Sequence, residues 1–154
     1  MSAVIEKHDH HHGPQKGVLR WLFTTNHKDI GTLYLWFSFL MFLTGGAMAM
    51  GIRAELFEPG LQLMDPIRYN QLVTMHGLIM IFGGVMPAFV GLANWLIPMQ
   101  VGAPDMALPR MNNLSFWLLP AAFTILLSTA FMEGGMPGFG LSLIHISEPT
   151  RRSV

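Results

Sequence analysis

The chain has 154 residues, of which 51% are hydrophobic and 12% are charged, and nine basic residues balance nine acidic ones. Ordinary soluble domains carry roughly one-quarter charged residues, so this composition favours a membrane protein. The zero net charge gives no reason to expect a nucleic-acid partner, and a chain without cysteine has neither disulfides nor thiolate metal sites.

Residues 1–19 are predicted to form a flexible polar arm. The arm lacks the apolar segment and the cleavage site of a secretory signal peptide. It contains a short histidine tract, for which a solvated tail is a better interpretation than a metal site. No function is assigned to these histidines, which are His8, His10, His11 and His12.

Three stretches without Asp, Glu, Lys or Arg are each long enough to cross a bilayer as a helix, which needs about 20 largely apolar residues. The predicted spans cover residues 30–52, 69–98 and 111–132. The second span is expected to end near Pro98, because the segment PMQVGAP is rich in residues that interrupt helices. The expected fold class is therefore all-α, with three transmembrane helices that form part of a larger bundle.

The small residues Gly77, Gly84 and Gly91 recur at seven-residue intervals in the second span. On a regular helix this spacing places them along one side, which we expect to pack against another helix.

Basic residues gather before the first span, which predicts a cytoplasmic N-terminus by the positive-inside rule. The first loop then lies outside and the second loop inside. The basic residues before the first span are Lys7, Lys16, Arg20 and Lys28, against Arg53 and Arg68 in the first loop and Arg110 in the second.

His76 lies in the apolar string VTMHGLIMIFGGVMP of the second span. An ionisable side chain in this position is costly unless it faces the protein interior and has a partner. Neutral imidazole is a good ligand for haem iron, and Gly77 beside it leaves room for a macrocycle. From the residue alone, a histidine hydrogen-bonded between helices without a cofactor is an equal alternative.

Asp105 marks a second candidate site, in the string GAPDMALPRMNN between the second and third spans. Asn94 lies near the same end of the second span, and Asn112 and Asn113 follow the aspartate. A carboxylate at an aqueous mouth, with amides leading inward, can hold a water chain for protons. From these residues alone, a loop held by caps and salt bridges is the favoured interpretation.

Arg53 and Glu55 lie at the outer end of the first span, in the string IRAELFEPG. A local ion pair between them is the simplest structural expectation, and an exposed pair of this kind contributes little to stability.

The chain resembles subunit I of the haem–copper oxidases, specifically the cytochrome c oxidases with A-type haem. Four strings carry the resemblance: RWLFTTNHKDIGTLY, IRAELFEPG, TMHGLIMIFGGVMP and ANWLIPMQVGAPDMALPRMNNLSFWLLP. It covers roughly Arg20 to Gly140. The resemblance implies the start of a bundle of about twelve membrane helices, in an enzyme that reduces dioxygen to water with electrons from cytochrome c and translocates protons. The implied partners are the other oxidase subunits, cytochrome c and membrane lipid.

The resemblance also implies cofactor sites. His76 is one of two axial ligands of the low-spin haem A, and Arg53 hydrogen-bonds a substituent of that haem, which are two ways in which a protein sets haem potential. Glu55 and Gly60 match residues near a calcium or sodium site at the outer face, where hard oxygen ligands are suitable.

The resemblance further implies a proton uptake path. Asp105 matches the aspartate at its entrance, Asn94 and Asn112 match asparagines along it, and Tyr34 matches a tyrosine that lines it.

The copper, the second haem and their ligands are expected in the full subunit only, so the chain alone is not expected to be catalytic. After Gly140 the family pattern stops and LSLIHISEPTRRSV follows. Residues 141–154 are predicted to be a non-native tail, because LSLIHISEPTR is what a common transposase-based sequencing adapter gives when translated in frame. His145 is therefore given no role.

Two alternatives stay open at this point. One is a non-catalytic haem-binding or structural membrane fragment in which His76 is merely structural, and the other is part of a quinol oxidase. The strings RAEL and PDMA favour cytochrome c as the electron donor, and the string GGVMPAFVGLANW favours a bacterial plasma membrane. A small channel is disfavoured, because the spans contain no paired charges.

Overall fold

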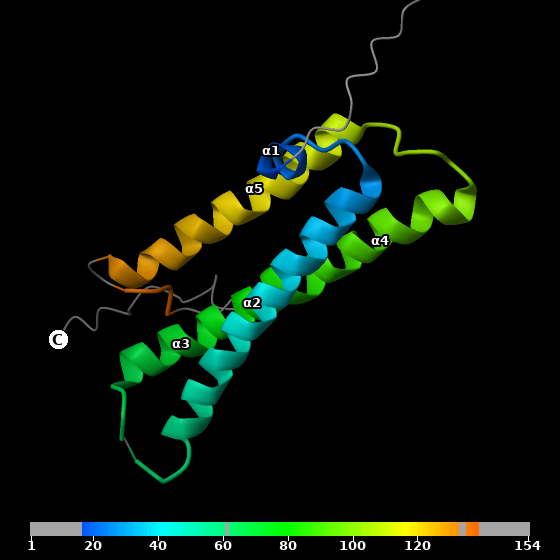
Figure 1. The fold of residues 1–154 in the computed structure, drawn as a ribbon. Coiled ribbons are helices and arrows are strands. Elements are labelled where there is room, and N and C mark those ends of the chain that lie inside the picture. The colour runs from blue at the N-terminus through cyan, green and yellow to red at the C-terminus, as the bar shows by residue number, and fades with distance from the viewer. Residues whose placement is uncertain (1–16, 61, 133–134, 139–154) are drawn as a thin grey trace, which may run out of the picture.

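The structure, a computed structural model, describes residues 17–60, 62–132 and 135–138, and these residues form helices, turns and loops without strands (Figure 1). The predictions for the histidine tract and for residues 141–154 lie outside this described part. The elements in chain order are α1 (Val18–Leu22), α2 (His27–Glu55), α3 (Pro66–Leu78), the π-helix η1 (Ile79–Val85), α4 (Met86–Val101), α5 (Pro109–Ser128) and the 3-10 helix η2 (Thr129–Phe131).

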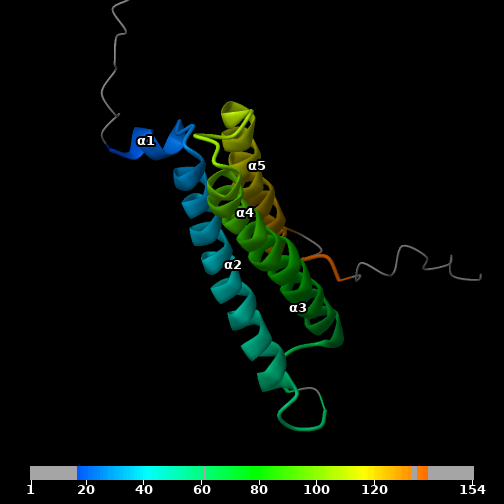
Figure 2. The ribbon, with the colours of Figure 1, turned by 90° about the vertical axis from the view of Figure 1, so that its right-hand side faces the viewer.

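Three helical units are long and apolar enough to cross a membrane, which confirms the predicted all-α membrane fold. They are His27–Glu55, Pro66–Val101 and Pro109–Phe131. The second unit is continuous through α3, η1 and α4, and it runs back alongside α2 (Figure 2). The α4–α5 loop lies at the same end of the bundle as α1, and the α2–α3 loop lies at the opposite end (Figure 1).

The helix ends follow from local sequence. Asn26 caps α2, because its side-chain oxygen accepts the backbone N–H of Lys28 at 3.0 Å. The second span ends at Val101 and not at Pro98, because a proline removes one hydrogen bond without preventing the next residues from continuing the helix. Gly102, with φ at 72°, terminates it in the left-handed conformation that glycine adopts without strain.

A small core of apolar and aromatic side chains joins the three spans. Tyr34 of α2 meets Phe116 of α5 edge to face, with ring centroids 5.1 Å apart, and Phe37 meets Phe123 in the same way at 5.5 Å. Many other large apolar side chains face outward, as expected where lipid or further helices surround a span. The buried apolar residues are Ile30, Tyr34, Phe37, Met75, Ile79, Phe116 and Phe123.

The π-helix η1 was not expected from the sequence. The N–H of Met86 bonds the carbonyl of Ile81, five residues back, and Pro87 follows directly. In α-geometry the Pro87 ring would clash with the carbonyl four residues earlier, and a wider turn avoids this. The predicted common side of three glycines is consequently wrong: Gly84 and Gly91 are buried, whereas a Cβ on Gly77 would meet nothing within 4 Å among the described atoms.

Candidate functional site

His76 is held by one ring nitrogen. Its Nδ1 lies 2.8 Å from the carbonyl oxygen of Gly45 on α2. A carbonyl only accepts, so Nδ1 carries the proton and donates, and in the neutral imidazole this leaves the lone pair on Nε2. Histidines that bind metals are oriented by such a second hydrogen bond. His76 therefore presents Nε2 as a potential ligand atom.

The surroundings of His76 combine one tight contact with open backbone. A Cβ on Gly45 would lie 2.6 Å from Sδ of Met80, so α2 and η1 touch here and the Gly45 carbonyl is fixed in place. A Cβ on Gly46 or on Gly77 would meet no described atom within 4 Å. Bare backbone on both sides of an oriented imidazole fits a broad, flat ligand such as a haem.

Arg53 lies two turns beyond this level, at the C-terminal end of α2. Its side chain is exposed and lines an open groove of about 390 Å³ together with Met50 and Phe57. Among the described residues it makes no ion pair with Glu55, because side chains two positions apart point to different sides of a helix. Gly46, Met50 and Arg53 share one face by their spacing.

The structure does not bring Arg53 into contact with His76. Gly45 and Arg53 are eight residues apart, which is about 12 Å along an α-helix. Any group that both side chains bind must therefore extend over roughly that distance along α2.

Glu55 instead anchors the α2–α3 loop. Its Oε1 accepts the N–H of Gln62 at 2.9 Å, and its Oε2 accepts the N–H groups of Leu63 and Met64 at 2.8 and 3.0 Å. Gly60 is exposed in this loop, with φ at 113°. A calcium ion needs six to eight oxygen ligands, and no cluster of three or more His, Cys, Asp or Glu exists within the described residues. These two residues alone do not complete a cation site, which stays a prediction.

Asn94 and Asn112 meet directly at the other end of the bundle. The Asn112 side-chain amide donates to Oδ1 of Asn94 at 2.6 Å, joining α5 to α4. Asn94 is only 3% exposed, and its own amide donates to the carbonyl of Val90 at 2.9 Å. A buried amide and a half-buried one thus satisfy each other as a pair.

Asp105 lies at the mouth of this region. Its side chain is 40% exposed, and its Oδ1 lies 3.3 Å from Nδ1 of His27 and accepts the N–H of Met106 at 2.8 Å. The sulfur of Met106 in turn lies 3.1 Å from the Asn112 amide nitrogen. Met106 therefore links the aspartate to the asparagine pair, and exposure falls from Asp105 inward to Asn94.

Tyr34 is separated from Asp105 and lies deeper in the bundle. It is 4% exposed and lines a cavity of about 350 Å³ with Val90 and Ser115 among its other walls. The Val90 carbonyl is the group that accepts the Asn94 amide. The four predicted residues therefore form two groups, the loop-side group of Asp105, Asn94 and Asn112 and the cavity-side Tyr34.

His27 is a site residue that the sequence analysis missed. It is 6% exposed, and its Nε2 is buried without a hydrogen-bond partner in the described structure. Its neighbours Asn26, Lys28 and Asp29 are polar, so an exposed histidine was the ordinary expectation. The signal in the sequence is its place at the first residue of the span, at the end where the Asp105 loop returns.

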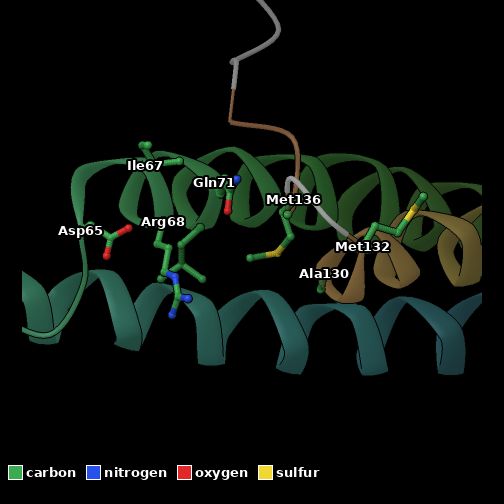
Figure 3. Close-up of a pocket in the computed structure, with 9 residues that line it drawn as sticks. Asp65, Ile67, Arg68, Gln71, Ala130, Met132 and Met136 are labelled. Carbon is green, nitrogen blue, oxygen red and sulfur yellow. The ribbon is translucent and has the colours of Figure 1, made fainter.

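A further cavity of about 550 Å³ lies near the start of α3, between α3 and the residues after η2 (Figure 3). Asp65, Arg68 and Gln71 line one side, and the Arg68 side chain extends across it toward α2 (Figure 3). Met132 and Met136 line the other side. Neither His76 nor Asp105 contributes to this cavity.

Residues 29–150 match the family described as Cytochrome C and Quinol oxidase polypeptide I. The chain belongs to this family. The match runs past Gly140 into the segment predicted to be non-native, so that prediction remains to be tested on the gene.

Individual relatives agree with the oxidase family. The chain is 47% identical over 127 residues to the probable cytochrome c oxidase subunit 1-alpha of Streptomyces coelicolor, covering 82% of this chain and 22% of that protein. It is 43% identical over 133 residues to cytochrome c oxidase subunit 1 of Corynebacterium diphtheriae, covering 85% and 24%. The corresponding protein of Corynebacterium glutamicum is 41% identical over 154 residues, covering 93% and 26%. The chain thus spans about a quarter of the length of these curated relatives.

Proposed function

We propose that this chain contributes the first three membrane helices of the catalytic subunit of a cytochrome c oxidase, and that His76 is an axial ligand of its low-spin haem A. The observation that carries the proposal is the bond from His76 Nδ1 to the Gly45 carbonyl, which leaves Nε2 free for iron. When bound, the haem supplies one-electron redox chemistry.

The residues of the chain orient and tune the haem in this proposal. The Gly45 carbonyl fixes the imidazole tautomer and plane, and Gly46 and Gly77 allow close approach of the macrocycle. Arg53 has no carboxylate partner among the described residues, and its guanidinium is available to donate to a haem substituent. A positive charge near the haem favours the reduced form and raises its potential.

Asp105, Asn112, Asn94 and Tyr34 serve proton uptake in this proposal. The exposed carboxylate of Asp105 collects protons at the aqueous face, and His27 beside it holds the carboxylate at the mouth. The asparagine pair and the cavity lined by Tyr34 provide polar groups and room for water further in. Protons move inward along water between these groups, since the amides themselves do not titrate.

The proposed setting is a bacterial plasma membrane with the N-terminus on the cytoplasmic side. The excess of Lys and Arg before α2 supports this orientation, and the relatives come from bacteria. Asp105 then faces the cytoplasm, and Arg53 and Glu55 face outward. The other oxidase subunits, cytochrome c and lipid are the proposed partners, and Glu55 with Gly60 is a proposed outer cation site.

The test is an optical spectrum of the assembled oxidase that carries the full-length subunit. His76→Ala should abolish the low-spin haem band, because alanine has no side-chain atom that can bind the iron. Asp105→Asn, the matched control, should retain that band and slow proton uptake. A normal low-spin band in the His76→Ala oxidase would refute the proposal and favour a structural histidine.

The identity of the electron donor distinguishes the proposed cytochrome c oxidase from the main alternative, a quinol oxidase. The matched family includes quinol oxidases, whereas the named relatives are cytochrome c oxidases. Purified oxidase should therefore be reduced by cytochrome c, and reduction by a quinol alone would favour the alternative.

A further inference from the structure

The π-helix η1 changes which faces of one continuous helix the two candidate sites occupy. His76 and Asn94 are 18 residues apart, which is five turns of α-helix, so on a regular helix they would share one face. In the structure, His76 bonds Gly45 on α2, whereas the Asn94 side chain bonds Asn112 on α5, although its Cβ also lies close to Gly31 of α2. One extra residue in a turn rotates the following residues by about 100°, which accounts for the bond of Asn94 to α5.

Two hydrogen bonds, one just before η1 and one within it, connect this part of the helix to α2. His76 donates to the carbonyl of Gly45, and the hydroxyl of Ser38 donates to the carbonyl of Gly84 at 2.6 Å. From 38 to 45 is seven residues on α2, whereas from 76 to 84 is eight residues on the opposing helix. Between the two bonds, seven residues of α2 thus face eight residues of the opposing helix, which agrees with one extra residue in the π-turn.

Ser38 is suited to hold this geometry. It is 7% exposed and 46 residues from its partner in the sequence, so the bond joins two helices and does not stabilise its own turn. Gly84 is the sixth residue of η1 and lies three residues before Pro87. The Ser38 hydroxyl thereby ties the carbonyl of a residue inside the π-turn to α2, and the loss of a buried hydrogen bond is costly in this apolar environment.

We propose that Ser38 is a positioning residue for the His76 ligand: by bonding Gly84 it keeps the extra residue within Ile79–Val85 and so fixes the rotation of the turn that carries His76. This inference rests on the proposed haem ligation. Without the bond, the wide turn can migrate along the helix, and the imidazole plane rotates relative to α2.

The experiment compares Ser38→Ala, Ser38→Cys and Thr44→Ala in the assembled oxidase. Thr44 is the matched control, because its hydroxyl lies on the same helix and donates to the carbonyl of Leu40 within that helix. Two readouts are taken: the electron paramagnetic resonance g-values of the low-spin haem, which report the ligand plane, and amide hydrogen exchange of residues 79–86, which does not depend on the haem.

Ser38→Ala should shift the g-values and speed exchange in residues 79–86 by about tenfold, the factor that matches one buried hydrogen bond. Ser38→Cys, with a weak donor of similar size, should give a smaller change in both, and it serves as the decisive variant if Ser38→Ala does not assemble. Thr44→Ala should leave both unchanged.

Unchanged g-values and exchange in the Ser38 variants would overturn the inference, and so would equal changes in Thr44→Ala. The His76→Ala oxidase keeps this failure distinct from that of haem ligation. If His76→Ala loses the low-spin signal while the Ser38 variants behave as wild type, only the positioning role falls. If His76→Ala keeps the signal, the ligation itself falls.

Discussion

Gly31→Ala tests the closest approach of two spans. A Cβ at position 31 would lie 2.9 Å from the carbonyl oxygen of Gly91 and 2.6 Å from Cδ1 of Trp95. The contact is reciprocal, because a Cβ at position 91 would lie 3.0 Å from the Gly31 carbonyl oxygen. Ordinary contacts begin at 3.4 Å, so α2 and α4 must separate by about 0.5 Å to admit the methyl group.

Neither neighbour yields easily to this methyl group. One is backbone, and the Trp95 ring is held by the bond from its Nε1 to the hydroxyl of Thr32 at 3.2 Å. Overpacking of this kind costs about 2 kcal/mol, and alanine in place of a mid-helix glycine returns about 1 kcal/mol. The expected net loss of unfolding free energy is therefore about 1 kcal/mol.

The measurement is equilibrium unfolding of the purified oxidase in detergent. Gly51→Ala is the control on the same helix, because a Cβ there would lie 3.3 Å from the end of the flexible Leu72 side chain, which can move aside. We expect Gly51→Ala to be as stable as wild type or more stable. If Gly31→Ala unfolds no earlier than Gly51→Ala, the crossing is not tightly packed and the reasoning is refuted.

Three further predictions concern two polar contacts and the C-terminal end of the sequence. Asn112→Ala should lower the free energy of unfolding by about 1–3 kcal/mol, since it removes the donor to buried Asn94. Ser115→Ala is the control and should change it little, because the exposed Ser115 hydroxyl bonds its own helix. Equal losses in the two variants would count against the amide pair. Glu55→Gln should speed amide hydrogen exchange of residues 62–64, because the Glu55 carboxylate accepts their N–H groups, and the control Glu58→Gln should not. Unchanged exchange in Glu55→Gln would show that Glu55 does not stabilise this loop. Sequencing of the source gene should show a different continuation after Gly140, and an intact reading frame to Val154 would disprove the predicted tail.

The spans could be predicted because hydropathy and charge act locally. A run without charged residues must be helical in a bilayer, and this placed all three spans within a few residues of their observed bounds. The proximity of Asn94 and Asn112 could also be predicted from the sequence, because a short loop returns the chain to the same end of the bundle.

The remaining features depend on contacts between distant residues. The Asp105 loop covers His27 although 78 residues separate them, so the burial of that histidine has no local signal. The π-turn has one local cue, Pro87 inside an apolar run, but the position of the turn depends on the partner helix. For the same reason the seven-residue spacing of glycines gave a wrong common face.

The separation of the two sites along one helix bears on energy conversion in the proposed oxidase. His76 and Asn94 are 18 residues apart, about 27 Å of α-helix, which approaches the roughly 30 Å of a bilayer core. In the proposed orientation His76 lies near the outer face and Asn94 near the cytoplasmic face. An electron that enters from outside moves negative charge inward, and a proton taken up from the cytoplasm moves positive charge outward. Both movements carry charge across the membrane in the same electrical direction, so a single helix that holds both sites at opposite depths suits an enzyme that builds a membrane potential.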